Sequence, residues 1–182
     1  MSPEPVASWR ADHDYFRTLL KLLQRETDLL HSGERPNYEL MLDVITYLRS
    51  YSDRFHHPRE DVAFALLAKH CPDMELALAR LRQEHRVIAI AGERLLGGLT
   101  AILDDALVPR TEIEAAAATY LVYYRHHIAT EEHDVLTRAE DTLTSEDWDM
   151  VNAAVQAEPD PLFGTNPEEH YRELRRHIAL ES

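Results

Sequence analysis

Apolar residues recur along the chain at spacings of three and four rather than two, which indicates amphipathic helices and not strands. Clusters of Pro, Gly and Asn interrupt the pattern and divide it into four long segments. The helices expected from these breaks cover roughly residues 6–31, 37–70, 73–105 and 111–141. Because short connections make successive helices antiparallel, we predict an all-α fold, an antiparallel up-down-up-down four-helix bundle.

Local signals add detail to this pattern. Pro58 lies inside the second helix, where it lacks an amide hydrogen and crowds the carbonyl four residues back, so we expect a kink or a loosened turn near Arg54. Thr111, with a glutamate three residues on, is the expected N-cap of the fourth helix. Beyond it, Ser145 is the expected cap of a short helix, and a last helix is expected near residues 167–180.

A chain of 182 residues is long enough to bury one sizeable core, and nothing in its composition demands a second one. We predict a bundle over residues 1–142 and a C-terminal helical extension, residues 143–182, packed on it. No apolar run approaches the ~18 residues that would span a bilayer, so we expect a soluble protein without a membrane partner. The N-terminus lacks the features of a secretory signal and Cys71 is the only cysteine, which favours the cytoplasm.

The formal net charge of −14 would repel phosphate backbones, and no cluster of Lys and Arg is large enough to overcome that repulsion. Nucleic acid is therefore excluded as an expected partner. The 11 histidines are the more informative excess, because histidine is scarce in most proteins and binds metals. Their positions along the helices decide whether several can meet at one place.

Two helices share a His-x-x-x-Glu pattern. His56 and Glu60 form it in the second helix, and His127 and Glu131 form it in the fourth. Residues four apart lie on the same face of a helix, so each pattern offers an imidazole nitrogen and a carboxylate to one point. The sequence therefore predicts four candidate metal ligands.

Two further histidines lie within apolar stripes and match these patterns in height. His13 precedes the first turn by roughly 18 residues and His56 follows it by about 20, which is ~27 to 30 Å along the axis on either side. His85 lies roughly 20 residues before the turn at Pro109, and His127 about 17 after it, again ~25 to 30 Å. The four histidines are thus expected in one layer, where they and the two glutamates form a single metal site.

The remaining histidines and acids receive other interpretations. His57 and His126 adjoin the chosen ligands but are rotated by about 100° from them, so they are second choices at the helix boundaries, with Asp61 as the acid that His57 would pair with. Glu132 is expected on a solvated face, and Cys71 beside a helix stop. No metal is assigned to the histidines near helix ends or in the extension, which are His31, His70, His133, His170 and His177.

The ordered set of six resembles the ligands of haemerythrin-like, or HHE cation-binding, proteins over residues 9–140. It consists of His13, His56, Glu60, His85, His127 and Glu131. The resemblance implies a di-iron centre with an oxo or hydroxo bridge, in which Glu60 and Glu131 bridge the irons and the four histidines are terminal ligands. Imidazole and carboxylate both suit iron, although zinc or manganese would accept several of the same donors.

The chain departs from the oxygen-carrying members at one position. Those members place a second histidine one turn after the third-helix ligand, where this chain has Ala89. Our hypothesis is that Ala89 and Gly92 leave space beside the iron for dioxygen, peroxide, nitric oxide or a carboxylate. Tyr120 and Tyr123, seven and four residues before His127, are expected to donate hydrogen bonds around the ligands.

The function expected from this resemblance is binding or sensing of dioxygen, or of a related small ligand such as peroxide or nitric oxide. One alternative is a di-iron enzyme that consumes peroxide or nitric oxide, and another is iron storage or iron–sulfur repair. Relatives that perform repair carry an added cysteine-bearing N-terminal segment, which is not found here. No catalytic residue is assigned, and a homodimer or a regulatory protein partner stays open.

Overall fold

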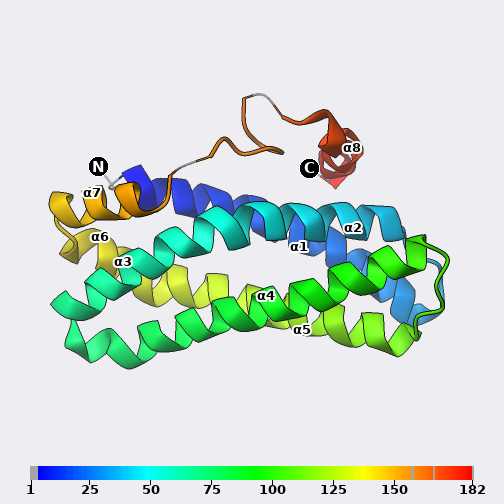
Figure 1. The fold of residues 1–182 in the computed structure, drawn as a ribbon, viewed down its shortest axis with the longest axis horizontal. Coiled ribbons are helices and arrows are strands. Elements are labelled where there is room, and N and C mark those ends of the chain that lie inside the picture. Colours follow the sequence, from blue (N-terminus) through cyan, green and yellow to red (C-terminus); the bar gives the residue numbers. More distant parts are fainter. Residues whose placement is uncertain (1–3, 157, 166, 182) are drawn as a thin grey trace.

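The computed structural model describes residues 4–156, 158–165 and 167–181, and these are helical with no strand among them. Four long rods form the body of the molecule. They are α1 (Glu4–Ser32); α2 (Tyr38–Tyr47) continued by η1 (Leu48–His56) and α3 (His57–His70); α4 (Glu75–Leu103), entered through η2 (Pro72–Met74); and α5 (Arg110–Thr130) continued by η3 (Glu131–Val135) and α6 (Leu136–Thr142). Figure 1 shows the rods side by side, with consecutive rods running in opposite directions. The all-α prediction is confirmed.

The ends of the helices follow from local side-chain chemistry, though not always from the residues expected. Asn37 caps α2 by accepting a backbone N–H at 3.0 Å. The expected Thr111 cap is wrong, because α5 begins one residue earlier and has no side-chain cap. The expected Ser145 cap is also wrong: α7 (Ser145–Ala154) is capped by Thr144, whose hydroxyl accepts from the Asp147 amide at 3.2 Å in a capping box.

The second rod carries a π-helical stretch. In η1 the backbone widens, and the amide of His57 donates to the carbonyl of Ser52, five residues back. The loosened turn expected near Arg54 is therefore confirmed, and regular helix resumes just before Pro58. The fourth rod repeats the feature in η3. Each His-x-x-x-Glu pattern thus adjoins a π-helical segment, and such segments are frequent at functional sites.

The buried apolar residues form two clusters, one toward each end of the bundle. Along every rod, the predicted ligands separate the residues of one cluster from those of the other. In the first rod, for example, Val6 and Trp9 belong to one cluster and Phe16 to the other, with His13 between them. The polar layer is therefore closed above and below by apolar side chains, which exclude water from it.

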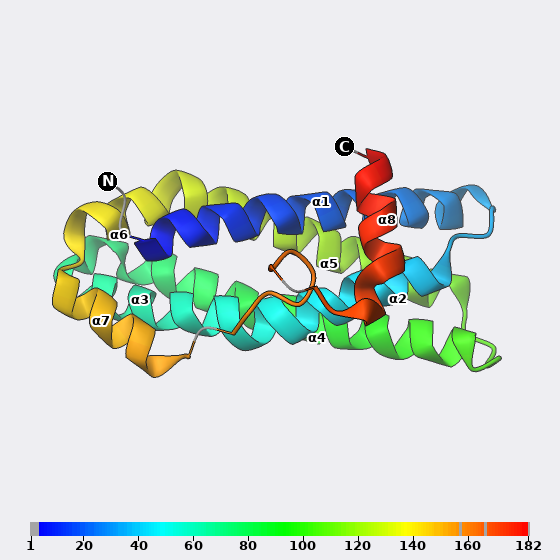
Figure 2. The same cartoon turned by 90° about the horizontal axis from the view of Figure 1, so that it is seen from above.

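The extension lies against the bundle. Trp148 of α7 joins the cluster at one end. The segment that follows crosses the first two rods, where the Tyr47 hydroxyl donates to Asp160 at 2.9 Å and Phe163 stacks on Tyr15 with centroids 4.0 Å apart. After η4 (Glu169–Tyr171), α8 (Arg172–Glu181) passes over α1 and α2, as Figure 2 shows. The division into residues 1–142 and 143–182 stays a prediction.

No helix in the part of the chain that the structure describes is both long enough and apolar enough to cross a membrane.

The Tyr47–Asp160 hydrogen bond should help to hold the extension on the bundle. We expect Tyr47→Phe to lower the free energy of unfolding by about 1–2 kcal/mol, because it leaves a partly buried carboxylate without its donor. Tryptic cleavage within α8 should also become faster. Tyr123→Phe, which removes a hydroxyl from the outer face of α5, is the control. Equal cleavage rates in the two variants would contradict the expectation.

Candidate metal centre

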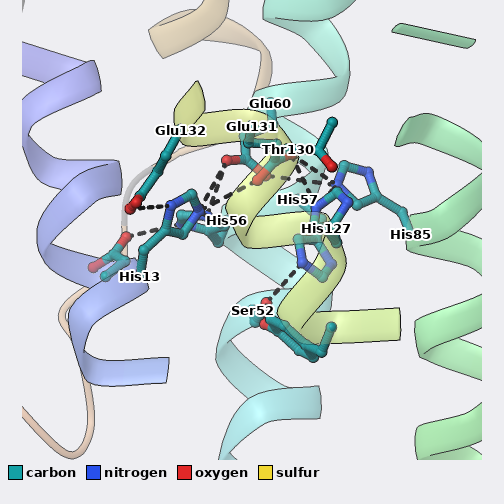
Figure 3. A network of polar contacts seen from close by, with 12 residues as sticks. His13, Ser52, His56, His57, Glu60, His85, His127, Thr130, Glu131 and Glu132 are labelled. Carbon is teal, nitrogen blue, oxygen red and sulfur yellow. Dashed lines mark hydrogen bonds and ion pairs between the residues drawn. The ribbon is translucent and has the colours of Figure 1, made fainter. Parts of the chain in front are cut away.

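The structure brings the six predicted ligands together in one buried layer (Figure 3). The four histidines meet as two pairs. In the first pair, the Nε2 atoms of His13 and His56 lie 3.1 Å apart. In the second pair, the Nε2 atoms of His85 and His127 lie 2.9 Å apart. Each pair joins histidines from two neighbouring rods, so all four rods contribute one imidazole.

The two glutamates lie between the pairs and reach both of them. One oxygen of Glu60 is 3.0 Å from Nε2 of His56, and the other is 3.6 Å from Nε2 of His85. One oxygen of Glu131 is 2.9 Å from Nε2 of His127, and the other is 3.4 Å from Nε2 of His13. Both carboxylates are fully buried. Each glutamate can therefore be shared by two ions, one at each pair.

A second set of acids faces the outer nitrogen, Nδ1, of each of the four histidines predicted as ligands. The contacts are Asp12 to His56 at 3.0 Å, Asp61 to His85 at 3.0 Å, Glu84 to His127 at 3.4 Å and Glu132 to His13 at 3.1 Å. We call Asp12, Asp61, Glu84 and Glu132 the carboxylate ring. Three of the contacts are hydrogen bonds, and Glu84 and His127 form an ion pair. Because a carboxylate only accepts, such contacts favour the imidazole proton on Nδ1 and turn the Nε2 lone pair inward, as metal-ligating histidines require.

The carboxylate ring closes around the bundle. Each acid lies on one rod and faces the histidine of the next, and Glu132 of the fourth rod returns to the first. The acid precedes a ligand in the first and third rods, as Asp12 precedes His13, and follows one in the second and fourth, as Asp61 follows Glu60. Because consecutive rods run in opposite directions, these opposite offsets point the same way around the bundle.

The ring was not anticipated from the sequence. Glu132, expected on a solvated face, is instead directed at His13, and Asp61 faces His85 rather than His57. The signal that could have revealed the ring is an acidic residue directly beside an inward-facing ligand in every rod. Asp12 and Glu84 adjoin histidines, whereas the other two acids adjoin glutamates.

The donor set fits transition-metal ions. With the protons held at Nδ1, the Nε2 atoms of each pair present lone pairs to one another across about 3 Å. The oxygens of Glu60 and Glu131 receive no hydrogen bond of good geometry, although they are buried. Such a concentration of buried lone pairs is unfavourable unless protons or cations occupy it. Imidazole and carboxylate are donors that iron, manganese and zinc accept.

Comparison with known protein families matches residues 4–139 to the haemerythrin HHE cation-binding domain. This chain belongs to the haemerythrin family. No curated protein and no solved structure matched the chain. The family match covers the four rods almost to the end of α6, so it includes both glutamates and both histidine pairs of the haemerythrin-like layer.

Protons compete with a metal for this haemerythrin-like site. Burial works against the charged form of His85, but Asp61 and Glu131 outweigh it and raise its pKa to about 10. The pKa of each of the other three ligand histidines is raised as well, because nearby carboxylates overcome burial. Burial and Glu131 oppose ionisation of Glu60, yet His56 prevails and lowers its pKa to about 2. A metal therefore displaces protons from imidazoles when it binds.

His57, a second choice in the sequence, lies buried beside the predicted ligands. It begins α3, at a helix boundary as expected, but its side chain is only 5% exposed, and its imidazole stacks on that of His85 with centroids 4.2 Å apart. Its counterpart His126, in the other motif, is 55% exposed. One nitrogen of His57 lies within 4.8 Å of donor atoms of Glu60, His85 and His127. The structure thus adds a fifth imidazole to the layer.

The tyrosines differ from the expectation. Tyr123 is 40% exposed and its expected part in the site is wrong. Tyr124 is the buried residue instead, and its hydroxyl is hydrogen-bonded to Ser52, which in turn contacts His57 at 3.1 Å. The Tyr120 hydroxyl is buried without a hydrogen-bond partner among the described residues. Gly92 lies against the Tyr120 aromatic ring, 3.0 Å from where a Cβ would stand, so its small size accommodates that ring.

The carboxylate ring should support metal affinity. Asp12→Asn keeps an acceptor for His56 but removes the charge, and we expect the affinity for the metal to fall roughly 10–100-fold, as is usual when such partners are lost. Competition with a chromophoric chelator measures the change. Asp28→Asn is the matched control, because Asp28 is an exposed residue of α1 that lies outside the carboxylate ring. Equal affinities for the two variants would show that the charge does not support the ligand.

Stability should depend on pH in opposite ways with and without metal. Since the pKa of His85 is raised from its ordinary 6.5 to about 10, its protonated form stabilises the metal-free protein below pH 6.5, and this contribution is lost as the pH rises toward 10. We expect the melting temperature of the metal-free protein to fall over that interval. Metal affinity should rise over the same interval, because fewer protons compete. A melting temperature that increases for the metal-free protein would contradict this.

Proposed function

We propose that this haemerythrin-family chain holds an oxo- or hydroxo-bridged di-iron centre and binds or senses dioxygen, or a related small ligand such as peroxide or nitric oxide. The proposal includes an antiparallel up-down-up-down four-helix topology, supported by the alternating course of the rods in Figure 1. One observation carries it: each buried glutamate reaches both histidine pairs, so two ions can share two carboxylates. Cys71, buried and unpaired, fits a reducing cytoplasm.

The residues would divide between the two ions as they divide in space. His13 and His56 would hold one iron, and His85 and His127 the other, with Glu60 and Glu131 bridging. The irons would supply one-electron redox chemistry and coordination positions for a small ligand. The carboxylate ring keeps each Nε2 directed at its ion and makes each imidazole a stronger donor. The two apolar clusters keep bulk water out, which slows the loss of iron.

A second candidate function is turnover of peroxide or nitric oxide. It is favoured by the hydrogen-bond chain from Tyr124 through Ser52 to His57, which is buried and ends at the metal layer. Such a chain can deliver a proton to a ligand that is being reduced. A protein that only binds a small ligand needs no delivery of protons to it. Measured consumption of peroxide or nitric oxide therefore distinguishes the two functions.

The metal content of protein purified without added metal tests the proposal. We expect two irons per chain, an absorption spectrum in air that is lost on reduction, and recovery of that spectrum on readmitting oxygen. Glu131→Gln keeps the shape of the side chain but removes a bridging charge, so its iron content should fall to one per chain or less.

Glu146→Gln is the control for this substitution, because Glu146 is an exposed residue of α7. Wild-type protein that retains no transition metal would overturn the proposal. Protein that retains iron but destroys peroxide or nitric oxide in steady state would replace the first function by the second.

A further inference from the structure

We propose that His57 is a third histidine ligand of the second iron, the one held by His85 and His127. The inference rests on the proposed di-iron function. The oxygen-carrying relatives that this chain resembles supply the corresponding imidazole from the third rod, one turn after the ligand. Ala89 stands at that position here and has no donor. The second rod would then provide two adjacent ligands, one for each iron.

The position of the imidazole supports this assignment. His57 stacks on His85 with an angle of 15° between the planes, and its centroid is 5.5 Å from that of His127. One of its nitrogens lies within 4.8 Å of the donor atoms of these two histidines and of Glu60. The first pair forms a separate group with the same glutamate. The buried donors thus divide into three histidines on one side of Glu60 and two on the other (Figure 3).

The π-helical segment explains why His57 faces inward. In a regular α-helix, neighbouring residues are rotated by about 100°, which would turn His57 away when His56 is a ligand. In η1 the turn is wider, and His57 aligns with Ser52, five residues back, at 3.1 Å. The fourth rod provides the comparison. Its His126–His127 pair lies in regular α5, before η3 begins, and there the neighbour of the ligand is exposed.

His57 also shares the orientation of the other ligands. Its Nδ1 faces a carboxylate, that of Asp53 at 3.4 Å, just as each ligand histidine faces a member of the carboxylate ring. Both oxygens of Asp53 are buried and have no hydrogen bond of good geometry, and its other charged neighbour is Arg49, at 3.9 Å. A proton held at Nδ1 leaves Nε2 as the free donor.

Ser52 can release Nε2 at little cost. Its hydroxyl contacts Nε2 of His57, but it is also hydrogen-bonded to the hydroxyl of Tyr124. When Nε2 turns to an ion, Ser52 keeps the tyrosine as its partner, and no buried hydroxyl is left unpaired. The alternative is that His57 only supports Ser52 and never contacts a metal. The two roles predict different effects of substituting Ser52.

The test compares wild type, His57→Ala and His126→Ala after anaerobic loading with Fe(II). For His57→Ala we expect the affinity of the protein for the second iron to fall by more than the roughly 10–100-fold that is usual when a hydrogen-bond partner of a ligand is lost. Millimolar imidazole should restore both the affinity and the absorption spectrum, because it can enter the vacated position. Wild type and His126→Ala should keep two irons per chain and show no response to imidazole.

Two further variants keep the result decisive. Ser52→Ala retains the imidazole and should keep two irons with wild-type affinity. His57→Asn replaces Nδ1 by an amide nitrogen and lacks Nε2, so it should behave like His57→Ala if the alanine variant unfolds, as circular dichroism will show. Unchanged iron affinity in the His57 variants, no imidazole response, or a Ser52→Ala variant that matches His57→Ala would each overturn the assignment. Wild type without iron would overturn the di-iron function as well, so the two failures are distinguishable.

Discussion

Contacts between buried imidazoles and carboxylates impose the main constraint on this bundle. Two glutamates and four histidines lie in the middle of an apolar interior, where each would be costly without a partner. The carboxylate ring places an acid against the outer nitrogen of each of these histidines, and every contact joins two different rods. All four rods must therefore hold one relative height for the four contacts to form together. The same contacts that orient the predicted ligands also hold the helices in register.

The π-helical segments η1 and η3 lie at the level of the buried histidines and glutamates. Both π-helical segments adjoin a His-x-x-x-Glu pattern, at the level where the apolar clusters give way to polar residues. In η1 the wider turn brings Ser52 and His57 together and adds an imidazole to the layer. Local departures from ideal helix geometry are expected where function competes with packing. Tyr124 extends the polar contacts from this layer into the neighbouring apolar cluster.

Much of this could be predicted from the sequence, because apolar spacing and helical rise are properties of single helices. They were sufficient to predict the rods and to place His13, His56, His85 and His127 at one height. The carboxylate ring was missed because its contacts cross between rods, and the direction of a side chain around a bundle depends on the packing of its neighbours. His57 was ranked second because a rotation of about 100° per residue was assumed, which does not hold where the helix widens. The expected caps lie two residues (Thr111) and one residue (Ser145) beyond the observed N-cap positions, within the ordinary uncertainty of helix ends.

The alternating offsets of the ring have a topological consequence. Four consecutive antiparallel helices can wind clockwise or anticlockwise around a common axis, and hydrophobic burial hardly distinguishes these two mirror arrangements. Asp12 points toward the second rod only in the observed winding. In the opposite winding the same side of α1 would face the fourth rod, and each acid would be directed at the histidine of the preceding rod instead of the next. The direction in which the helices wind thus decides which imidazole each of the four acids faces.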